Sequence, residues 1–114
     1  MPRRRWRYYR TPAGAAPARE FIDTLDIVSA AAIFEAMHAV LMDGRAARHV
    51  RGEIYEARAR TREHVYRVLF SDEGSGGHVL LAVSAFEKKS RRTPLAEIDL
   101  AEARLADWRR RGRR

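Results

Sequence analysis

The segment from residue 53 to residue 86 reads EIYEARARTREHVYRVLFSDEGSGGHVLLAVSAF, and it decides the fold. Apolar and polar residues alternate with period two over residues 53–60 and again over residues 65–70, on either side of a short polar turn. The run from residue 78 to residue 86 is apolar at both parities, which is typical of a strand buried on both faces. The segment therefore predicts a three-stranded antiparallel meander whose last strand is the most buried.

The turn between the first two strands would set two arginines side by side. A two-residue loop at residues 62–63 pairs Thr61 with His64, and counting back places Arg58 directly opposite Arg67 on one side of the sheet. Arg-Glu is a poor dipeptide for such a turn, so this register stays open by a residue or two. Alternation in the second strand still puts Arg67 on the face opposite its apolar neighbours.

Two like charges directly opposite each other weaken a hairpin unless an anion compensates them. One interpretation is that Arg58 and Arg67 bind an anionic ligand. The other is that Glu56 or Glu53, on the facing strand, neutralises Arg67. The spacing leaves both interpretations open.

A cluster of cations follows the most buried strand. Between Phe86 and a Thr-Pro helix start stand Lys88, Lys89, Arg91 and Arg92. Thr93 is the expected N-cap of the following helix, with Pro94 at its first position. These cations either contact a polyanion or form a solvated loop. Phe86 ends an apolar strand, so core packing is favoured over base stacking for its ring.

The remaining elements are read from periodicity and turn residues. We expect a short strand at 6–10, helices at 17–25 and 26–42, a basic loop containing Arg45, Arg48, His49 and Arg51, a Gly-rich loop at 72–77, a closing helix after Pro94, and a basic tail at 109–114. This order predicts a small α+β domain with a mostly antiparallel sheet, an N-terminal helix pair on one face and a C-terminal helix. The other face would then be free to bind a partner.

Composition limits the function classes. The 114 residues suit one domain, residues 1–114, and a net charge of +8 with a pI near 10.9 favours nucleic acid or an acidic protein as the partner. There is no cysteine, no apolar run long enough to span a bilayer, and no apolar segment after the basic start, so we expect a cytoplasmic protein with no membrane role. The four histidines have no metal-ligand spacing, and nucleotide-binding and nucleophile motifs are missing; we expect neither metal nor cofactor.

Five pieces of the chain, in order and spacing, resemble the phage-derived HigB-like branch of the RelE/ParE toxin superfamily. They are Tyr8-Tyr9-Arg10-Thr11-Pro12-Ala13-Gly14, Pro17-Ala18-Arg19-Glu20-Phe21-Ile22, Ile54-Tyr55-Glu56-Ala57-Arg58, Tyr66-Arg67-Val68-Leu69-Phe70 and Phe86-Glu87-Lys88-Lys89-Ser90-Arg91-Arg92-Thr93-Pro94. The resemblance implies a RelE-like fold and the toxin of a type II toxin–antitoxin pair, which cuts mRNA, in many relatives on the ribosome. It also implies a helix-turn-helix (HigA-like) antitoxin as partner.

By position, the resemblance assigns roles in attack of a ribose 2′-hydroxyl on the adjacent phosphate, a reaction that needs no metal. Arg58 and Arg67 would hold the phosphate, while Lys88 and Lys89 would bind phosphate or transfer a proton. The expected RNA contacts are Arg91, Arg92, Phe86 and His64. Relatives often carry a tyrosine near the C-terminus, whereas this chain has Trp108, so the acid and base stay unassigned and His64, beside the hairpin turn, is a candidate substitute.

Two other functions stay open. A ParE-like protein would inhibit DNA gyrase by binding, without cleaving anything. A basic module that binds RNA or DNA without any activity would also fit the composition. The arginines and the Lys-Lys pair favour the nuclease over the gyrase inhibitor.

Overall fold

The structure, a computed structural model, describes residues 4–73 and 78–112. Its elements in chain order are β1 (Arg5–Tyr8), α1 (Pro17–Asp23), α2 (Ile27–Met42), the short 3-10 helix η1 (Gly44–Ala46), β2 (Arg48–Arg51), β3 (Ile54–Arg60), β4 (Val65–Glu73), β5 (Val79–Glu87) and α3 (Leu95–Arg110). Within the described ranges, none of the helices combines the length and apolar character needed to cross a bilayer. The predicted α+β class is confirmed.

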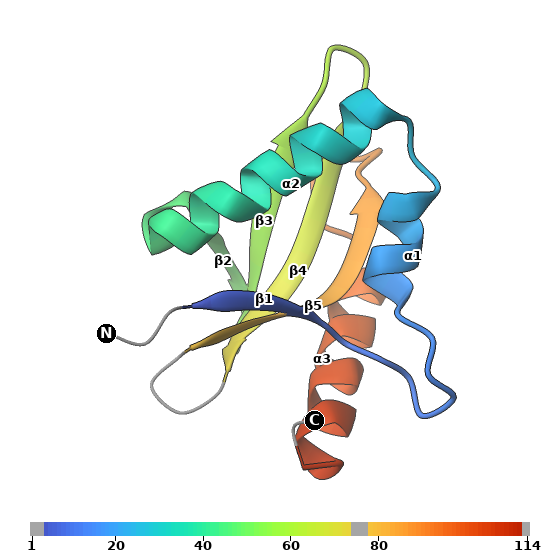
Figure 1. Cartoon of the computed structure of the whole chain (residues 1–114), viewed down its shortest axis with the longest axis vertical. Helices are drawn as coiled ribbons and strands as arrows, with labels where there is room; N and C mark the ends of the chain where they lie inside the picture. The colour runs from blue at the N-terminus through green and yellow to red at the C-terminus, as the bar shows by residue number, and fades with distance from the viewer. Residues whose placement is uncertain (1–3, 74–77, 113–114) are drawn as a thin grey trace.

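The sheet has five strands in the order β1-β5-β4-β3-β2 (Figure 1). The three strands β3, β4 and β5 form the predicted antiparallel meander, and β1 adds a parallel edge beside β5. Most residues of β5 are buried, as expected for a strand with apolar residues at both parities. The sheet is therefore mixed but mostly antiparallel.

The turn between β3 and β4 confirms the predicted register. The backbone N–H of Thr61 donates to the carbonyl of His64 at 2.9 Å, and Arg58 lies directly opposite Arg67. The hydroxyl of Thr61 accepts hydrogen bonds from the backbone N–H groups of Glu63 and His64. This side-chain support stabilises a loop whose own residues are poor turn formers.

Helices cover both faces of the sheet. On one face, α1 and α2 pack against a core that contains Ile33, Met37, Ala57, Tyr66 and Val68. The opposite face carries a second core, in which α3 covers part of the sheet through Ala101, Leu105 and Trp108 over Leu69, Leu81 and Val83. The expectation that this face is wholly open was therefore wrong. The part of this face next to the N-terminal end of α3 remains uncovered and is available for a site.

Three local predictions need correction. The segment predicted as a basic loop forms η1 and then the edge strand β2. In the antiparallel register of β2 and β3, Arg48 lies opposite Glu56. Pro94 takes the N-cap position of α3, so Thr93 does not cap the helix. Of the predicted loop at 72–77, the first two residues continue β4 and the other four lie outside the described residues.

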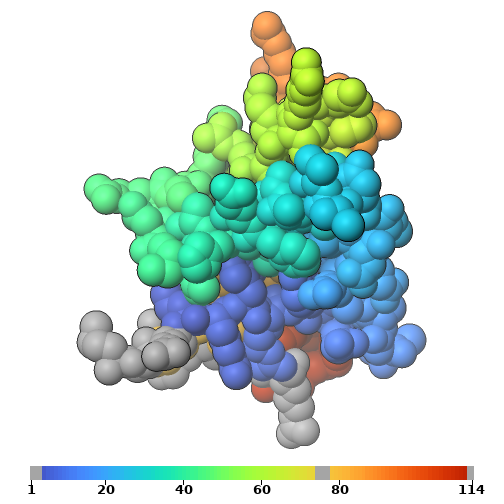
Figure 2. Space-filling model, turned by 45° about the horizontal axis from the view of Figure 1, so that its top comes forward, coloured from blue at the N-terminus to red at the C-terminus, as the bar shows by residue number. Residues whose placement is uncertain are grey.

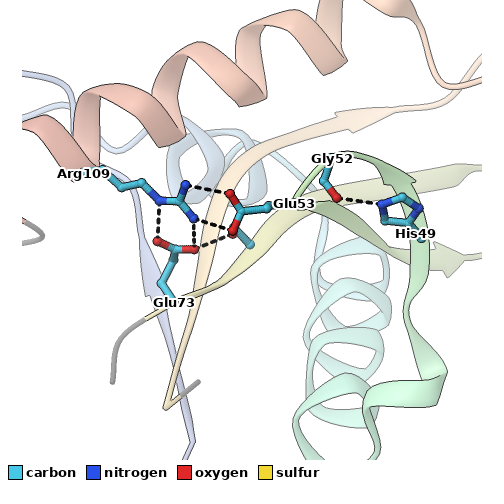
Figure 3. Close-up of polar contacts among 6 residues, drawn as sticks. His49, Gly52, Glu53, Glu73 and Arg109 are labelled. Carbon is cyan, nitrogen blue, oxygen red and sulfur yellow. Dashed lines mark hydrogen bonds and ion pairs between the residues drawn. The ribbon is translucent and has the colours of Figure 1, made fainter. Parts of the chain in front are cut away.

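The end of α3 is also more ordered than a basic tail. Arg109 is helical and bridges two carboxylates (Figure 3): it bonds Glu73, which is buried, at 2.7 Å and Glu53 at 2.8 Å. Arg111 pairs with Asp107 at 2.6 Å. The contacts of Arg109 tie the helix to β4 and to the turn between β2 and β3, while residues 113–114 of the predicted tail lie outside the described residues.

Candidate functional site

Five cations gather on the sheet face that α3 leaves uncovered. We call Arg48, Arg58, Arg60, Arg67 and Lys88 the cation cluster. The first three lie on β2 and β3, Arg67 lies on β4, and Lys88 directly follows β5. Strand alternation places them there, because the residues between them in β3 and β4, such as Ala59 and Tyr66, point into the core under α1 and α2. Three adjacent strands thus place like charges on one surface.

A buried ion pair lies at the centre of the cation cluster. Glu56 is 2% exposed and Arg67 is 8% exposed, and the Nε atom of Arg67 lies 3.4 Å from Oε2 of Glu56. Glu56 also accepts a hydrogen bond from the hydroxyl of Thr93 at 2.9 Å. The expectation that Glu56 neutralises Arg67 is confirmed. Thr93 thus ties the start of α3 to the sheet instead of capping the helix.

Burial and neighbouring cations make Arg67 an unusual arginine. Burial lowers the pKa of its guanidinium; Glu56 opposes this shift, and Arg58, Arg48 and Arg60 add to it. Its Nε atom is buried, and among the described residues it has no hydrogen-bond partner. The cation cluster holds five cations around the single carboxylate of Glu56. This excess of positive charge attracts an anion to the surface.

Lys88 lines a groove beside the ion pair. The groove has a volume of about 300 Å³, and its polar lining comes from Arg48, His49, Glu56, Lys88, Arg91, Arg92 and Thr93. The ammonium of Lys88 donates to the backbone carbonyls of Ser90 and Arg91, which fixes the turn that carries Arg91 and Arg92. Burial lowers the pKa of Lys88, as do Arg67 and Arg48, against the opposite effect of Glu56. A second hollow, of about 260 Å³, opens beside Arg58, Arg60 and Arg67.

The structure brings most of the predicted site residues together. Arg58, Arg67 and Lys88 belong to the cation cluster, and Arg91 and Arg92 line the adjoining groove. Lys89 is exposed next to Lys88. All of these side chains are cationic, so together they form an extended positively charged surface around the ion pair.

Two predicted RNA contacts have other places in the fold. Phe86 lies directly opposite Arg67 in the register of β4 and β5, but its ring belongs to the core under α3 with Leu105 and Trp108. His64 lies beside the start of α2, where its Nδ1 atom is 2.9 Å from Glu87 and its ring contacts Tyr66, on the other face of the sheet. His64 is therefore not placed to act on a phosphate held by Arg67.

The contact between His64 and Glu87 gives a testable pH effect. Glu87 raises the pKa of His64, so this pair stabilises the fold below the ordinary pKa near 6.5 and stops doing so as pH rises through the raised value. We expect the substitution Glu87→Gln to lower the pKa of His64. An NMR titration of the imidazole in both proteins measures the change, and an unchanged pKa would show that the pair does not form.

Sequence reasoning missed two members of the cation cluster. Arg60 could have been found, because it stands two residues from Arg58 on the same strand and so shares its face. Arg48 could not, since β2 is too short and too polar to be distinguished from a loop in the sequence. Its strand is recognisable once the pairing with β3 is known.

The comparisons with known proteins bear on the same residues. No curated protein matches the sequence. The family model described as phage derived protein Gp49-like (DUF891) matches residues 20–106, a range that contains the whole cation cluster and the groove. This family is generally associated with RelE-like toxins. The match covers more than half of the chain, and we conclude that the protein belongs to the phage-derived Gp49-like family.

Proposed function

We propose that this protein is the toxin of a type II toxin–antitoxin pair, of the HigB-like branch, and that it acts as a metal-independent mRNA endoribonuclease in the cytoplasm. The observation that carries the proposal is the cation cluster, which surrounds a buried carboxylate on the uncovered part of the sheet. A phosphodiester chain fits such a surface, because arginine forks match phosphate oxygens in geometry and charge.

The reaction would begin with attack of a ribose 2′-hydroxyl oxygen on the adjacent phosphorus. A new P–O bond forms, the bond to the 5′-oxygen breaks, and the products are a 2′,3′-cyclic phosphate and a free 5′-hydroxyl. Negative charge builds on the phosphoryl oxygens in the transition state, and Arg58 and Arg67 lie side by side to receive it. The chain's own cations supply this charge.

The groove offers two groups for the proton transfers. Glu56 lines it as a carboxylate and would accept the proton of the 2′-hydroxyl. Lys88 lines it as an ammonium with a lowered pKa and would protonate the leaving 5′-oxygen. The two side chains line the same groove from β3 and from the end of β5.

The role of Lys88 predicts a pH effect. A general acid must be protonated, so the rate of RNA cleavage should fall as pH rises through the pKa of Lys88, which lies below its ordinary 10.5. Lys88→Arg keeps the charge but releases its proton far less readily, and we expect a loss of about a hundredfold in rate together with loss of the alkaline decline. Lys89→Arg, next in the chain, is the matched control and should keep the wild-type profile.

One observation favours a second candidate. Arg67 is buried and already paired with Glu56, an arrangement that a non-catalytic binding protein would also tolerate. A ParE-like gyrase inhibitor is therefore the alternative, and a basic nucleic-acid-binding module is the simpler version of it. Incubating the purified protein with RNA and with translating ribosomes, in parallel with a DNA gyrase supercoiling assay, separates them. RNA cleavage in either mixture supports the nuclease; gyrase inhibition without cleavage supports the alternative.

A toxin of this kind implies partners. We propose that mRNA, on the ribosome, is the substrate and that a helix-turn-helix (HigA-like) antitoxin blocks the protein. An acidic or amphipathic antitoxin segment would complement the groove lined by Arg48, Arg91 and Arg92. Co-expression with the small reading frame next to the gene, followed by affinity purification of the toxin, should recover both proteins together. Recovery of the toxin alone would contradict this partner.

A further inference from the structure

The outer face of α2 is apolar although it is exposed. Ile27 is 87% exposed, Val28 68% and Met42 71%. Ala31 and Ala39 are exposed between them. With 3.6 residues per turn these positions share one side of the helix, opposite the buried Ile33, Met37 and Val40. We call Ile27, Val28, Ala31, Glu35, Ala39 and Met42 the α2 outer face.

No other described element covers this surface. Figure 2 shows α2, in teal to green, running across the molecule with α1 beside it and its outer side open. Exposed Glu35 and His38 stand between the apolar side chains at its two ends, so the face combines apolar and polar contacts, as protein–protein interfaces do. The helix does not need it for its own packing, because the inner side of α2 already fills the core over β3 and β4.

Charge shows what kind of partner fits the α2 outer face. Residues 20–44 contain five carboxylates and no Lys or Arg, in a chain whose net charge is +8. Two of the five are paired at the ends of the stretch, Asp23 with Arg19 and Asp43 with Arg45. Glu35, in the middle of the outer face, is exposed and has no ion pair among the described residues. The segment itself is therefore acidic, unlike the cation cluster, and Arg62 of the β3–β4 turn lies beside Val28 at its N-terminal end.

We propose that the α2 outer face docks an amphipathic helix of a partner protein, with an apolar stripe flanked by Lys or Arg. The apolar stripe would pack along Val28, Ala31 and Met42, where the alanine allows close approach. A basic residue of the partner would pair with Glu35. A second copy of this chain fits poorly, because a symmetric pair of α2 helices would bring acidic segments together. The proposal does not rest on the nuclease function, since this face lies on the opposite side of the sheet from the cation cluster.

A matched pair of peptides tests this proposal on the full chain. The first is a 16-residue amphipathic helix with a Leu/Ala stripe flanked by Lys; the second has Glu in place of each Lys. At an ionic strength near 0.15 M, where charges beyond about 8 Å are screened, local charge decides the outcome. We expect the Lys peptide to bind at 1:1 stoichiometry in calorimetry, at least tenfold more tightly than the Glu peptide, and to shift the amide NMR signals of α2.

Variants locate the binding. The double substitution Val28→Gln with Met42→Gln, and separately Glu35→Lys, should each weaken the Lys peptide at least tenfold. Leu100→Gln, at an exposed apolar residue of α3, is the control and should leave binding unchanged. All four positions are exposed, so circular dichroism should confirm an intact fold. Equal or stronger binding of the Glu peptide would overturn the proposal. So would dimerisation in sedimentation that the Val28/Met42 variant abolishes, since a second copy would then be the occupant.

Discussion

Replacing Arg67 with Gln should lower the rate of RNA cleavage at least a hundredfold. Arg67 is the cation that strand register sets beside Arg58 and that burial shields from water, so its charge acts strongly on a phosphate bound there. Removing one preorganised donor from a transition-state site typically costs a factor of about 10² to 10³. The measurement is the single-turnover rate on a short RNA, or on mRNA in a translating extract if the protein needs the ribosome.

Two controls separate chemistry from folding. Arg67→Gln leaves the buried Glu56 without its cation and should also lower the melting temperature. The double variant Arg67→Gln with Glu56→Gln removes both charges, so it should regain stability without regaining cleavage. Arg19→Gln removes the same charge from the opposite side of the molecule, at α1, and should cleave normally. If Arg67→Gln cleaves within about threefold of wild type, the phosphate is not held there.

Replacing Arg109 with Ala should destabilise the fold by about 3–5 kcal/mol, because it leaves a buried carboxylate without its counter-ion. Glu73 is 5% exposed and takes two hydrogen bonds from Arg109 at 2.7 and 2.9 Å (Figure 3). Ser71 supplies the one remaining side-chain partner of this carboxylate among the described residues, at 2.7 Å. Urea unfolding at pH 7 gives the change in the free energy of unfolding. Arg110→Ala, one residue further along and 70% exposed, should change it by no more than about 0.5 kcal/mol.

The contribution of Glu73 to the pH dependence of stability should change sign when Arg109 is replaced by Ala. Burial alone raises the pKa of Glu73, but hydrogen bonds from Arg109 and Ser71 outweigh it and lower the pKa below the ordinary 4.5. In the wild type this group therefore stabilises the fold above that value and ceases to do so as pH falls. Without Arg109, burial and the charge of Glu53 raise the pKa of Glu73 against the single hydrogen bond from Ser71, and the variant should lose stability as pH increases toward 7. A constant difference between the two proteins from pH 4 to pH 7 would contradict this account.

Much of the fold follows from alternation and turns in the sequence. A two-residue turn at residues 62–63 predicted that Arg58 faces Arg67, and alternation predicted the face of the sheet that carries Arg67. β5 is largely buried, as its apolar residues at both parities predicted, but the expectation that it is the most buried strand was wrong, because more residues are buried in β4, the central strand of the sheet. The position of α3 could not be predicted in the same way. Its apolar stripe identifies a helix, but the face of the sheet that it covers depends on packing between distant residues such as Tyr9 and Trp108.

The site was predictable only in part, for physical reasons. Arg67 and Lys88 stand at positions that strand alternation and the strand-helix junction single out. The positions of Phe86 and His64 depend on tertiary contacts that a local sequence pattern does not contain. α3 buries the phenyl ring of Phe86, and Glu87 holds the imidazole of His64 on the other face of the sheet. The sequence around Thr93 is typical of a helix N-cap, but the hydroxyl of Thr93 donates a hydrogen bond to the carboxylate of Glu56 instead.

The central claim is that the surface around Arg67 and Lys88 promotes attack of a ribose 2′-hydroxyl on phosphate. The direct measurement compares an RNA oligonucleotide with the same oligonucleotide carrying one 2′-deoxy nucleotide on the 5′ side of the cleaved bond, with product ends identified by mass spectrometry. We predict cleavage of the RNA to a 2′,3′-cyclic phosphate and a 5′-hydroxyl, and no cleavage at the deoxy position. Equal cleavage of both, or no cleavage of the RNA with or without ribosomes, would contradict the account.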